Sequence, residues 1–329
     1  MNAAFDPNAA APSESGIFGL THTLDEALVQ VFAVPFDATT SYRKGAAKGP
    51  EAVLAASRQI DLFDLDFGRP YERGIALLPV DARIPALQEE ASALSAPIIA
   101  CGGDLGAERG LAQKLARVNA IGAELNAIVE QAVERALASQ KLPVVLGGDH
   151  ATPFGALRAA ASRHPGLGIL HFDAHADLRA AYEGITWSHA SILRNVVERL
   201  PAVGKVVQVG VRDLCEEEYA LIARSVDRIH TLYDRVWASA RVAGQDLRAL
   251  ARNHLAKLPA EVWISFDVDG LDPALCPNTG TPVPGGLGWA DAMLWLEELV
   301  QSGRRVVGLD LYEHGEKADR PQRQRDQGR

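Results

Sequence analysis

The chain alternates between short apolar runs and longer segments in which apolar residues recur every three or four positions. Short runs bounded by polar and turn-forming residues are typical of strands. The periodic segments are typical of amphipathic helices, and the clearest ones extend from Val118 to about Ser139 and over residues 289–300. This alternation predicts an α/β fold with a central parallel sheet covered by helices on both faces. Strands are expected at residues 28–32, 144–146, 168–172, 205–210, 262–266 and 304–309.

The same pattern predicts one three-layer α/β/α domain over residues 26–313, with a polar segment at each end. Residues 1–25 are rich in Ala, Pro, Ser and Asn, which predicts a flexible N-terminal extension. Residues 314–329 hold a single apolar residue, Ala318, among Gln, Arg, Asp and Gly, so they predict a polar tail without an amphipathic helix. Residues 84–117 are rich in alanine and receive no assignment.

Composition narrows the class of protein. The 329 residues, of which 47% are hydrophobic, are enough to bury a large core. A net charge of −9 argues against a nucleic-acid partner, because phosphate contacts need clustered Lys and Arg. The 3 cysteines form no CxxC motif, which indicates a reducing compartment. Neither a basic leader nor a run of about 18 apolar residues occurs, so we expect a cytoplasmic protein without a membrane partner.

Carboxylates and imidazoles follow three of the predicted strands directly. Asp173, His175 and Asp177 come after residues 168–172, and Asp267 and Asp269 come after residues 262–266. Residues spaced by two point to one side of an extended chain, so each set can converge. The third strand, 144–146, is followed by Gly147, Gly148, Asp149 and His150. The carboxyl ends of neighbouring parallel strands are where open α/β sheets bind ligands, so the three segments together predict a two-metal site.

Other interpretations of these segments are weaker. An Asp-x-Asp beside a glycine is often only a turn or a helix cap, but three strands with such endings are hard to assign to chance. A calcium loop starting at Asp267 would need glycine at its sixth position and glutamate at its twelfth, where Asp272 and Asn278 stand. Carboxylates and imidazoles suit Mn²⁺, whereas a thiolate-rich site would suggest zinc, and no cysteine lies in these motifs.

Four motifs, taken in order, resemble those of the ureohydrolases, the arginase and agmatinase superfamily. The resemblance covers roughly residues 28–313 and implies an arginase-like α/β fold with two Mn²⁺ ions per subunit, or Ni²⁺ in some members. It also implies hydrolysis of a guanidino group to an amine and urea, in a homo-oligomer that is a trimer or a hexamer. The motifs are Gly147-Gly-Asp-His150, Asp173-Ala-His-Ala-Asp177, Ser265-Phe-Asp-Val-Asp-Gly-Leu-Asp-Pro273 and Thr279-Gly-Thr-Pro-Val-Pro-Gly-Gly286.

The resemblance also implies a role for each matching residue. His189 matches the position that shuttles protons, and Glu313 matches the carboxylate that grips the substrate guanidinium. Asp177 would also steady the attacking hydroxide. One metal ion would be held by His150, Asp173, Asp177 and Asp267, and the other by Asp173, His175, Asp267 and Asp269, with Asp173 and Asp267 bridging the two.

The identity of the substrate follows less directly. The stretches 177–184 and 188–191 look more like those of agmatinases than of arginases, which makes agmatine the first expectation. Arg179 in the mouth of the site would instead favour a carboxylate, as in 4-guanidinobutyrate, and Glu183 would do the opposite. Guanidine and arginine stay open as substrates. A non-catalytic metal-binding relative need not keep His189, and a single-zinc, deacetylase-like amidohydrolase would not need both histidines and all four aspartates.

Overall fold

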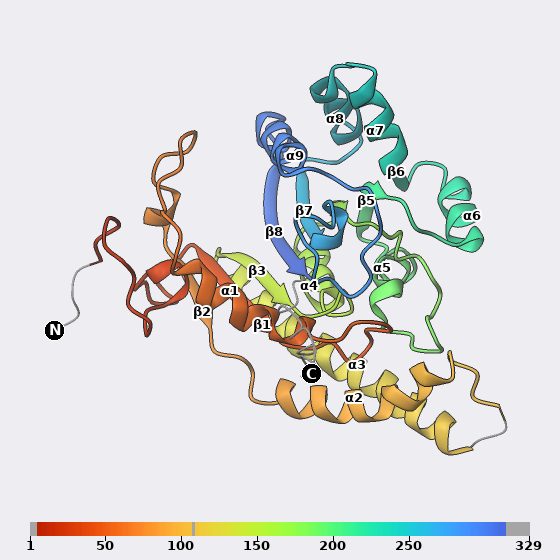
Figure 1. The fold of residues 1–329 in the computed structure, drawn as a ribbon. Helices are drawn as coiled ribbons and strands as arrows, with labels where there is room; N and C mark the ends of the chain where they lie inside the picture. The colour runs from red at the N-terminus through yellow and green to blue at the C-terminus, as the bar shows by residue number, and fades with distance from the viewer. Residues whose placement is uncertain (1–4, 107–108, 314–329) are drawn as a thin grey trace, which may run out of the picture.

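The computed structural model describes residues 5–106 and 109–313, and these form an α/β fold around one eight-stranded sheet (Figure 1). The strand order is β2-β1-β3-β8-β7-β4-β5-β6, and every neighbouring pair is parallel. The predicted fold class is therefore confirmed. The strands are β1 (Val29–Val34), β2 (Ile75–Leu78), β3 (Leu142–Gly147), β4 (Leu167–Phe172), β5 (Val203–Val211), β6 (Ile229–Tyr233), β7 (Glu261–Asp267) and β8 (Arg305–Tyr312).

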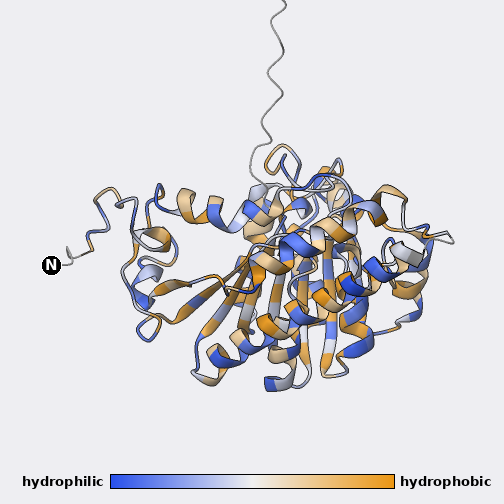
Figure 2. Cartoon of the chain, turned by 90° about the horizontal axis from the view of Figure 1, so that it is seen from below, coloured by the Kyte–Doolittle hydropathy of each residue, from blue (hydrophilic) through white to orange (hydrophobic). Residues whose placement is uncertain are grey.

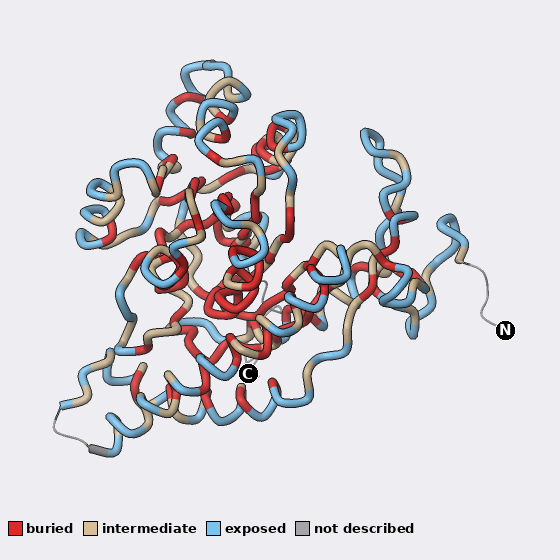
Figure 3. The backbone as a smooth tube through the Cα atoms, turned by 180° about the vertical axis from the view of Figure 1, so that it is seen from behind, coloured by how far each residue is buried: buried red, intermediate tan, exposed pale blue. Residues whose placement is uncertain are grey.

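Helices cover both faces of the sheet and bury two separate apolar clusters against it. Residues of α2, α3, α4 and α5 join one cluster, and residues of α7, α8 and α9 join the other. Figure 3 shows the buried residues concentrated in the interior of the molecule and the exposed residues on its outer segments. The helices are α1 (Gly49–Ser57), α2 (Ile84–Ala100), α3 (Arg109–Ala138), α4 (Phe154–Arg163), α5 (Ile192–Arg199), α6 (Glu216–Arg224), α7 (Asp234–Val242), α8 (Leu247–Leu255) and α9 (Trp289–Gln301).

The apolar pattern accounts for the interior elements. All six residues of β4, near the middle of the sheet, are buried, as expected for a strand with helices on both faces. On α3 the buried residues Val118, Ile121, Leu125 and Ile128 recur every three or four positions, and the last three join the cluster packed against the sheet. Figure 2 shows the apolar residues gathered on the strands between the helical layers. All six predicted strands are confirmed, as β1, β3, β4, β5, β7 and β8.

The elements that the sequence did not predict lie mainly at the edges. The two edge strands, β2 and β6, are short and only partly buried, so their apolar pattern is weak. The unassigned region 84–117 holds α2 and the start of α3. Pro97 stands inside α2, where it removes a backbone donor and obscures the helical signal.

Part of the segment expected to be a flexible extension packs on the body of the protein. Ile17 and Leu20 are buried, and Ile17 joins a small cluster with Val31 of β1 and Leu146 of β3.

The polar tail expected at residues 314–329 lies outside the described residues. Among the helices of the described part of the chain, none is long and apolar enough to span a membrane.

Candidate metal centre

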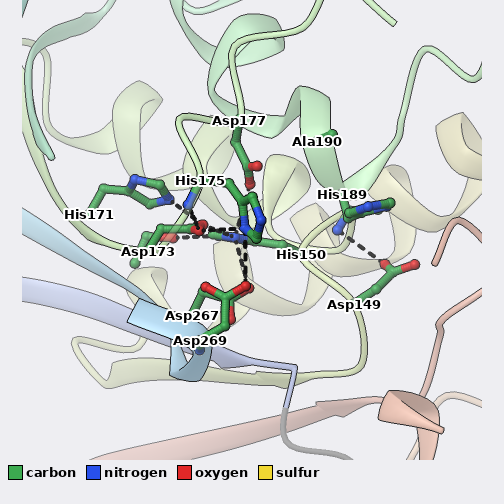
Figure 4. Close-up of polar contacts among 12 residues, drawn as sticks. Asp149, His150, His171, Asp173, His175, Asp177, His189, Ala190, Asp267 and Asp269 are labelled. Atoms are coloured by element: carbon green, nitrogen blue, oxygen red, sulfur yellow. Dashed lines mark hydrogen bonds and ion pairs between the residues drawn. The ribbon is translucent and has the colours of Figure 1, made fainter. Parts of the chain in front are cut away.

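The expected site residues lie at the carboxyl ends of four neighbouring strands, at one edge of the sheet. In the order β3, β8, β7, β4, these strands are followed or ended by His150, Glu313, the segment 267–269 and the segment 173–177. Figure 4 shows the six expected metal ligands, from three of these strands, converging on a common centre. The carboxyl edge of the parallel sheet therefore gathers these residues, and this is the edge at which open α/β sheets bind ligands.

The first group of ligands surrounds the imidazole of His150. Its Nδ1 atom lies 3.0 Å from Asp173 Oδ2, 3.2 Å from Asp177 Oδ2 and 3.3 Å from Asp267 Oδ2. All four side chains are buried. Three carboxylate oxygens thus lie around one imidazole nitrogen, a set of donor atoms that a divalent cation can bind.

The second group surrounds His175 and shares one carboxylate with the first. His175 Nδ1 lies 3.4 Å from Asp173 Oδ1 and 3.0 Å from Asp269 Oδ2. Asp173 therefore turns one oxygen toward His150 and the other toward His175. A carboxylate with its two oxygens in two ligand groups is placed to bridge two ions.

The charge of the cluster fits divalent cations. Burial and the charge of Asp173 raise the pKa of Asp177 to about 7, and burial raises the pKa values of Asp267 and Asp269. Among the described residues, the side chains of these three aspartates form ion pairs only with histidines. Buried carboxylates without a full counter-charge are costly, and bound cations remove that cost. The donor set of oxygen and imidazole nitrogen suits Mn²⁺ and similar ions.

Ser265 and Asp310 orient the ring of His150 through its Nε2 atom, on the side opposite the ligand carboxylates. Its Nε2 atom lies 3.1 Å from Ser265 Oγ, and Ser265 donates to Asp310 Oδ1 at 2.7 Å. Because the single hydroxyl proton goes to Asp310, Ser265 accepts from Nε2–H and leaves Nδ1 for a metal ion. Sequence reasoning missed Ser265 and Asp310 in this role. They are register partners on β7 and β8, which only the strand order reveals.

His171 supports Asp173 from the strand itself. It is buried on β4, and its Nε2 atom lies 3.1 Å from Asp173 Oδ2. Its Nδ1 atom lies 3.3 Å from the amide nitrogen of Gln208 on β5. Burial lowers the pKa of His171, which favours the neutral imidazole. His171 is thus a packed, hydrogen-bonded strand histidine that orients one carboxylate of the cluster.

A cavity of about 480 Å³ opens over the ligand cluster, a volume typical of small-molecule sites. His175 and Asp177 line it beside His189, the expected proton shuttle. Burial, with a contribution from the charge of His175, lowers the pKa of His189 to about 4. Residues from separate loops complete the wall, including Arg43, Arg179, Tyr182, Asp213, Glu218 and Thr281.

Glu313 is held at the end of β8, next to the metal cluster. Its backbone N–H donates to the carbonyl of Gly148 at 2.8 Å, and its Oε2 accepts from the N–H of Gly280 at 3.1 Å. Burial and the charge of Asp267 raise its pKa well above the usual range. A side chain at position 280 would bring Cβ within 2.7 Å of Glu313 Oε2, so the motif glycine permits this contact.

The two residues expected at the mouth of the site are placed differently. Arg179 lines the cavity, with its guanidinium 5.1 Å from the ring centre of Tyr182 and its Nε 3.9 Å from Glu218 Oε2. Glu183 is not among the lining residues; its backbone packs against Gly103 instead. The structure therefore brings Arg179, but not Glu183, to the mouth of the cavity.

Buried carboxylates and histidines at the carboxyl edge of a parallel sheet, beside a small-molecule cavity, define a candidate metal-dependent hydrolase. Comparison with known proteins narrows this class. A family model described as the arginase family matches residues 27–324, and the chain belongs to this family. This result confirms the ureohydrolase resemblance and the enzyme class expected from it, a hydrolase acting on guanidino carbon–nitrogen bonds.

Individual relatives are named for hydrolysis of different guanidino compounds. The chain is 32% identical to an N(1)-aminopropylagmatine ureohydrolase of Thermus thermophilus over 301 residues, 90% of this chain and 86% of that protein. It is 30% identical to a guanidinobutyrase of Pseudomonas aeruginosa over 313 residues, 93% of this chain and 82% of that protein. The agmatine ureohydrolase of Thermoplasma volcanium has a similar fold, with a TM-score of 0.70, 24% identity, and coverage of 92% of this chain and 87% of that one.

Proposed function

We propose that the protein hydrolyses agmatine to putrescine and urea at a centre of two divalent metal ions. The observation that carries this proposal is the pair of ligand groups that share Asp173, of which Asp177 in one group and His175 in the other line a small cavity. His150, Asp173, Asp177 and Asp267 would hold one ion, and Asp173, His175, Asp267 and Asp269 the other. Two such ions supply a water molecule acidic enough to serve as the nucleophile near neutral pH. The donor set favours Mn²⁺, with Ni²⁺ as the alternative.

The remaining site residues would act on the substrate itself. Glu313 would pair with the guanidinium, because a carboxylate matches its parallel N–H groups. Asp177 would hold the nucleophilic water through an oxygen that does not bind metal. His189, which its lowered pKa keeps neutral at pH 7, would accept a proton and transfer it to the departing nitrogen.

Replacing Glu313 by glutamine tests its contact with the guanidinium. We expect Glu313→Gln to raise KM and to lower kcat/KM by at least about 10-fold, because a neutral amide pairs poorly with a guanidinium. The measurement is urea release over a range of agmatine concentrations, with metal content determined on the same sample. Unchanged kinetics with full metal content would mean that Glu313 does not contact the substrate.

The cavity wall also supports a second candidate, hydrolysis of a guanidino acid such as 4-guanidinobutyrate. Arg43 and Arg179 both line the cavity, and either cation could receive a carboxylate tail. Against this, Asp213 lines the same cavity with its side chain 65% exposed, which suits the ammonium of agmatine. Glu218 is less available, because its oxygens already accept from the backbone N–H groups of Leu178 and Cys215. One relative is a guanidinobutyrase, which supports 4-guanidinobutyrate as the second candidate substrate.

A panel of guanidino compounds separates these candidates. We expect kcat/KM for agmatine to exceed that for arginine by at least about 10²-fold, because arginine brings an extra carboxylate whose burial without a partner is costly. Urea release from agmatine, 4-guanidinobutyrate, arginine and guanidine, with added Mn²⁺ or Ni²⁺, gives the ranking. Equal or better turnover of arginine would contradict the agmatinase assignment while leaving a guanidino hydrolase.

Arg179→Ala refines the ranking. If Arg179 repels the ammonium of agmatine, the variant should keep or improve activity on agmatine and lose activity on 4-guanidinobutyrate. Arg43→Ala is the matched variant on the same cavity wall. Comparing the two variants shows which of the two arginines affects activity on 4-guanidinobutyrate. A loss of agmatine activity in Arg179→Ala would contradict the repulsive role.

The proposal also covers the domain bounds, the cellular compartment and the oligomeric state. The catalytic domain would span residues 26–313, and the protein would work in the cytoplasm as a homo-oligomer, a trimer or a hexamer. The absence of a CxxC motif supports a reducing compartment. Sedimentation of the metal-loaded protein measures the oligomeric state.

A further inference from the structure

His189 contacts a residue that none of the motifs includes. Thr39 lies in the loop after β1 and is buried. Its Oγ1 atom accepts the backbone N–H of His189 at 3.0 Å and lies 3.3 Å from His189 Nδ1. Ser188 Oγ, the other side-chain oxygen near this nitrogen, is farther away, at 3.4 Å. Thr39 is therefore the closest polar partner of the ring of the expected proton shuttle among the described residues.

The hydrogen bonds of Thr39 decide which atom is the donor. A hydroxyl has one proton, and Thr39 Oγ1 donates it to Asp149 Oδ2 at 2.8 Å. Asp149 is held in place by other donors, since it accepts from the N–H of Thr39 at 3.0 Å and from the N–H of Ala151 at 3.1 Å. With its proton committed to the carboxylate, Thr39 can only accept from the ring of His189. A hydrogen bond between the ring and Thr39 Oγ1 therefore requires the ring hydrogen to be on Nδ1.

We propose that Thr39, oriented by Asp149, is a positioning residue that keeps His189 in the tautomer protonated on Nδ1. Nε2 is then the nitrogen free to exchange a proton with the substrate in the cavity. This inference rests on the proposed function of His189 and adds the atom that reacts and the residues that select it. Figure 4 shows Asp149 and His189 side by side, next to the ligand cluster.

The same arrangement occurs a second time in this site. His150 is backed by Ser265 and Asp310 through a hydroxyl that donates to a buried carboxylate. In both cases the hydroxyl is placed to accept from one ring nitrogen, so the other ring nitrogen is the one left with a lone pair. The tautomer matters for turnover, because a histidine in the wrong tautomer presents a hydrogen where the reaction needs a lone pair.

Kinetics of three variants test the inference. Thr39→Val keeps the shape and removes the hydroxyl, so we expect kcat to fall by about 10-fold or more, which is part of the roughly 10²–10⁴-fold that a general acid–base group contributes. Thr39→Ser restores a hydroxyl and should restore most of kcat. Thr40→Val is the matched control, because Thr40 lies 3.5 Å from the same Asp149 oxygen but makes no hydrogen bond to His189 in the described structure. Its kcat should be close to that of the wild type.

The tautomer itself is measured by nitrogen-15 NMR of histidine-labelled protein loaded with diamagnetic Zn²⁺. The His189 signals are assigned by their loss in His189→Ala. We expect the neutral ring of the wild type to be protonated on Nδ1, and the ring of Thr39→Val to shift toward protonation on Nε2. A wild-type ring protonated on Nε2 would overturn the inference even if Thr39→Val does not fold.

The two proposals fail in different ways. If Thr39→Val folds, binds metal and keeps both the tautomer and kcat, the inference is wrong while urea release by the wild type still supports the proposed function. If the wild type releases no urea from any guanidino compound, the proposed function fails. The NMR spectrum then still decides whether Thr39 selects the tautomer.

Discussion

Asp267→Ala should abolish measurable urea release and weaken the binding of both metal ions. Asp267 lies 3.3 Å from His150 in the first ligand group, and we propose that it also binds the second ion beside Asp269. Losing a metal ligand should lower affinity by more than the roughly 10–100-fold that follows the loss of a residue supporting a ligand. His150→Ala should weaken chiefly one ion, because its Nδ1 faces only the first group. Elemental analysis after metal loading and dialysis measures both effects.

The matched control is Asp272→Ala in the same motif. Asp272 is exposed, and its carboxylate accepts the backbone N–H of Ala274 at 2.8 Å, which makes it a turn residue. It should retain both ions and nearly full activity. Recovery of one ion per chain from the wild type, even at saturating Mn²⁺, would contradict the two-metal proposal. Loss of only one ion in Asp267→Ala would mean that Asp267 does not bridge.

Much of this site could be predicted because its information is local in the chain. Asp173, His175 and Asp177 share one strand ending, and the spacing of two along extended backbone is enough to make them converge. Asp267 and Asp269 follow the same rule. The parallel sheet then brings the separate strand endings to one edge, and the alternation of apolar runs and amphipathic segments predicts such a sheet. Neither step needs knowledge of which strands are neighbours.

The supporting residues could not be predicted because their partners are distant in sequence. Ser265 reaches Asp310 across 45 positions, and Thr39 reaches Asp149 across 110. A serine or threonine beside an apolar run carries no signal of its own, since its function depends on strand order and loop placement. The same limit explains Glu183. Glu183 was expected to favour a cationic substrate, but its backbone has a positive φ of 52° and packs on Gly103, and it is not among the residues that line the cavity.

The edge strands could not be predicted for a different reason, which is that their apolar pattern is short and mixed. A central strand such as β4 is buried on both faces, so its apolar run is continuous and easy to recognise. In β2 and β6 only some residues are buried, and these strands are 4 and 5 residues long. A pattern so short and mixed does not differ from that of a loop. Prediction from the sequence is therefore most reliable at the centre of the sheet, where the site also lies.

His189→Ala should lower kcat by about 10²-fold or more while both metal ions stay bound, the usual scale for the loss of a general acid–base group. His189 lines the cavity, but no aspartate of the ligand cluster forms an ion pair with it in the described structure. Metal content and kcat, measured on the same preparation, separate the two roles. Loss of an ion in this variant would make His189 a ligand. A His254→Ala variant, which removes a histidine on α8 hydrogen-bonded to Leu250, controls for general effects of losing an imidazole.

Chemical rescue by added imidazole tests whether His189 transfers protons. The substitution leaves space in a wall of the cavity, and a small soluble base that enters this space can carry the proton between water and the departing nitrogen. We therefore expect imidazole to restore part of the kcat of His189→Ala, in a concentration-dependent manner, and to restore no measurable urea release in Asp267→Ala. The two variants would then divide the site into a part that binds metal and a part that moves protons. Equal rescue of both variants, or full activity of His189→Ala without imidazole, would contradict that division.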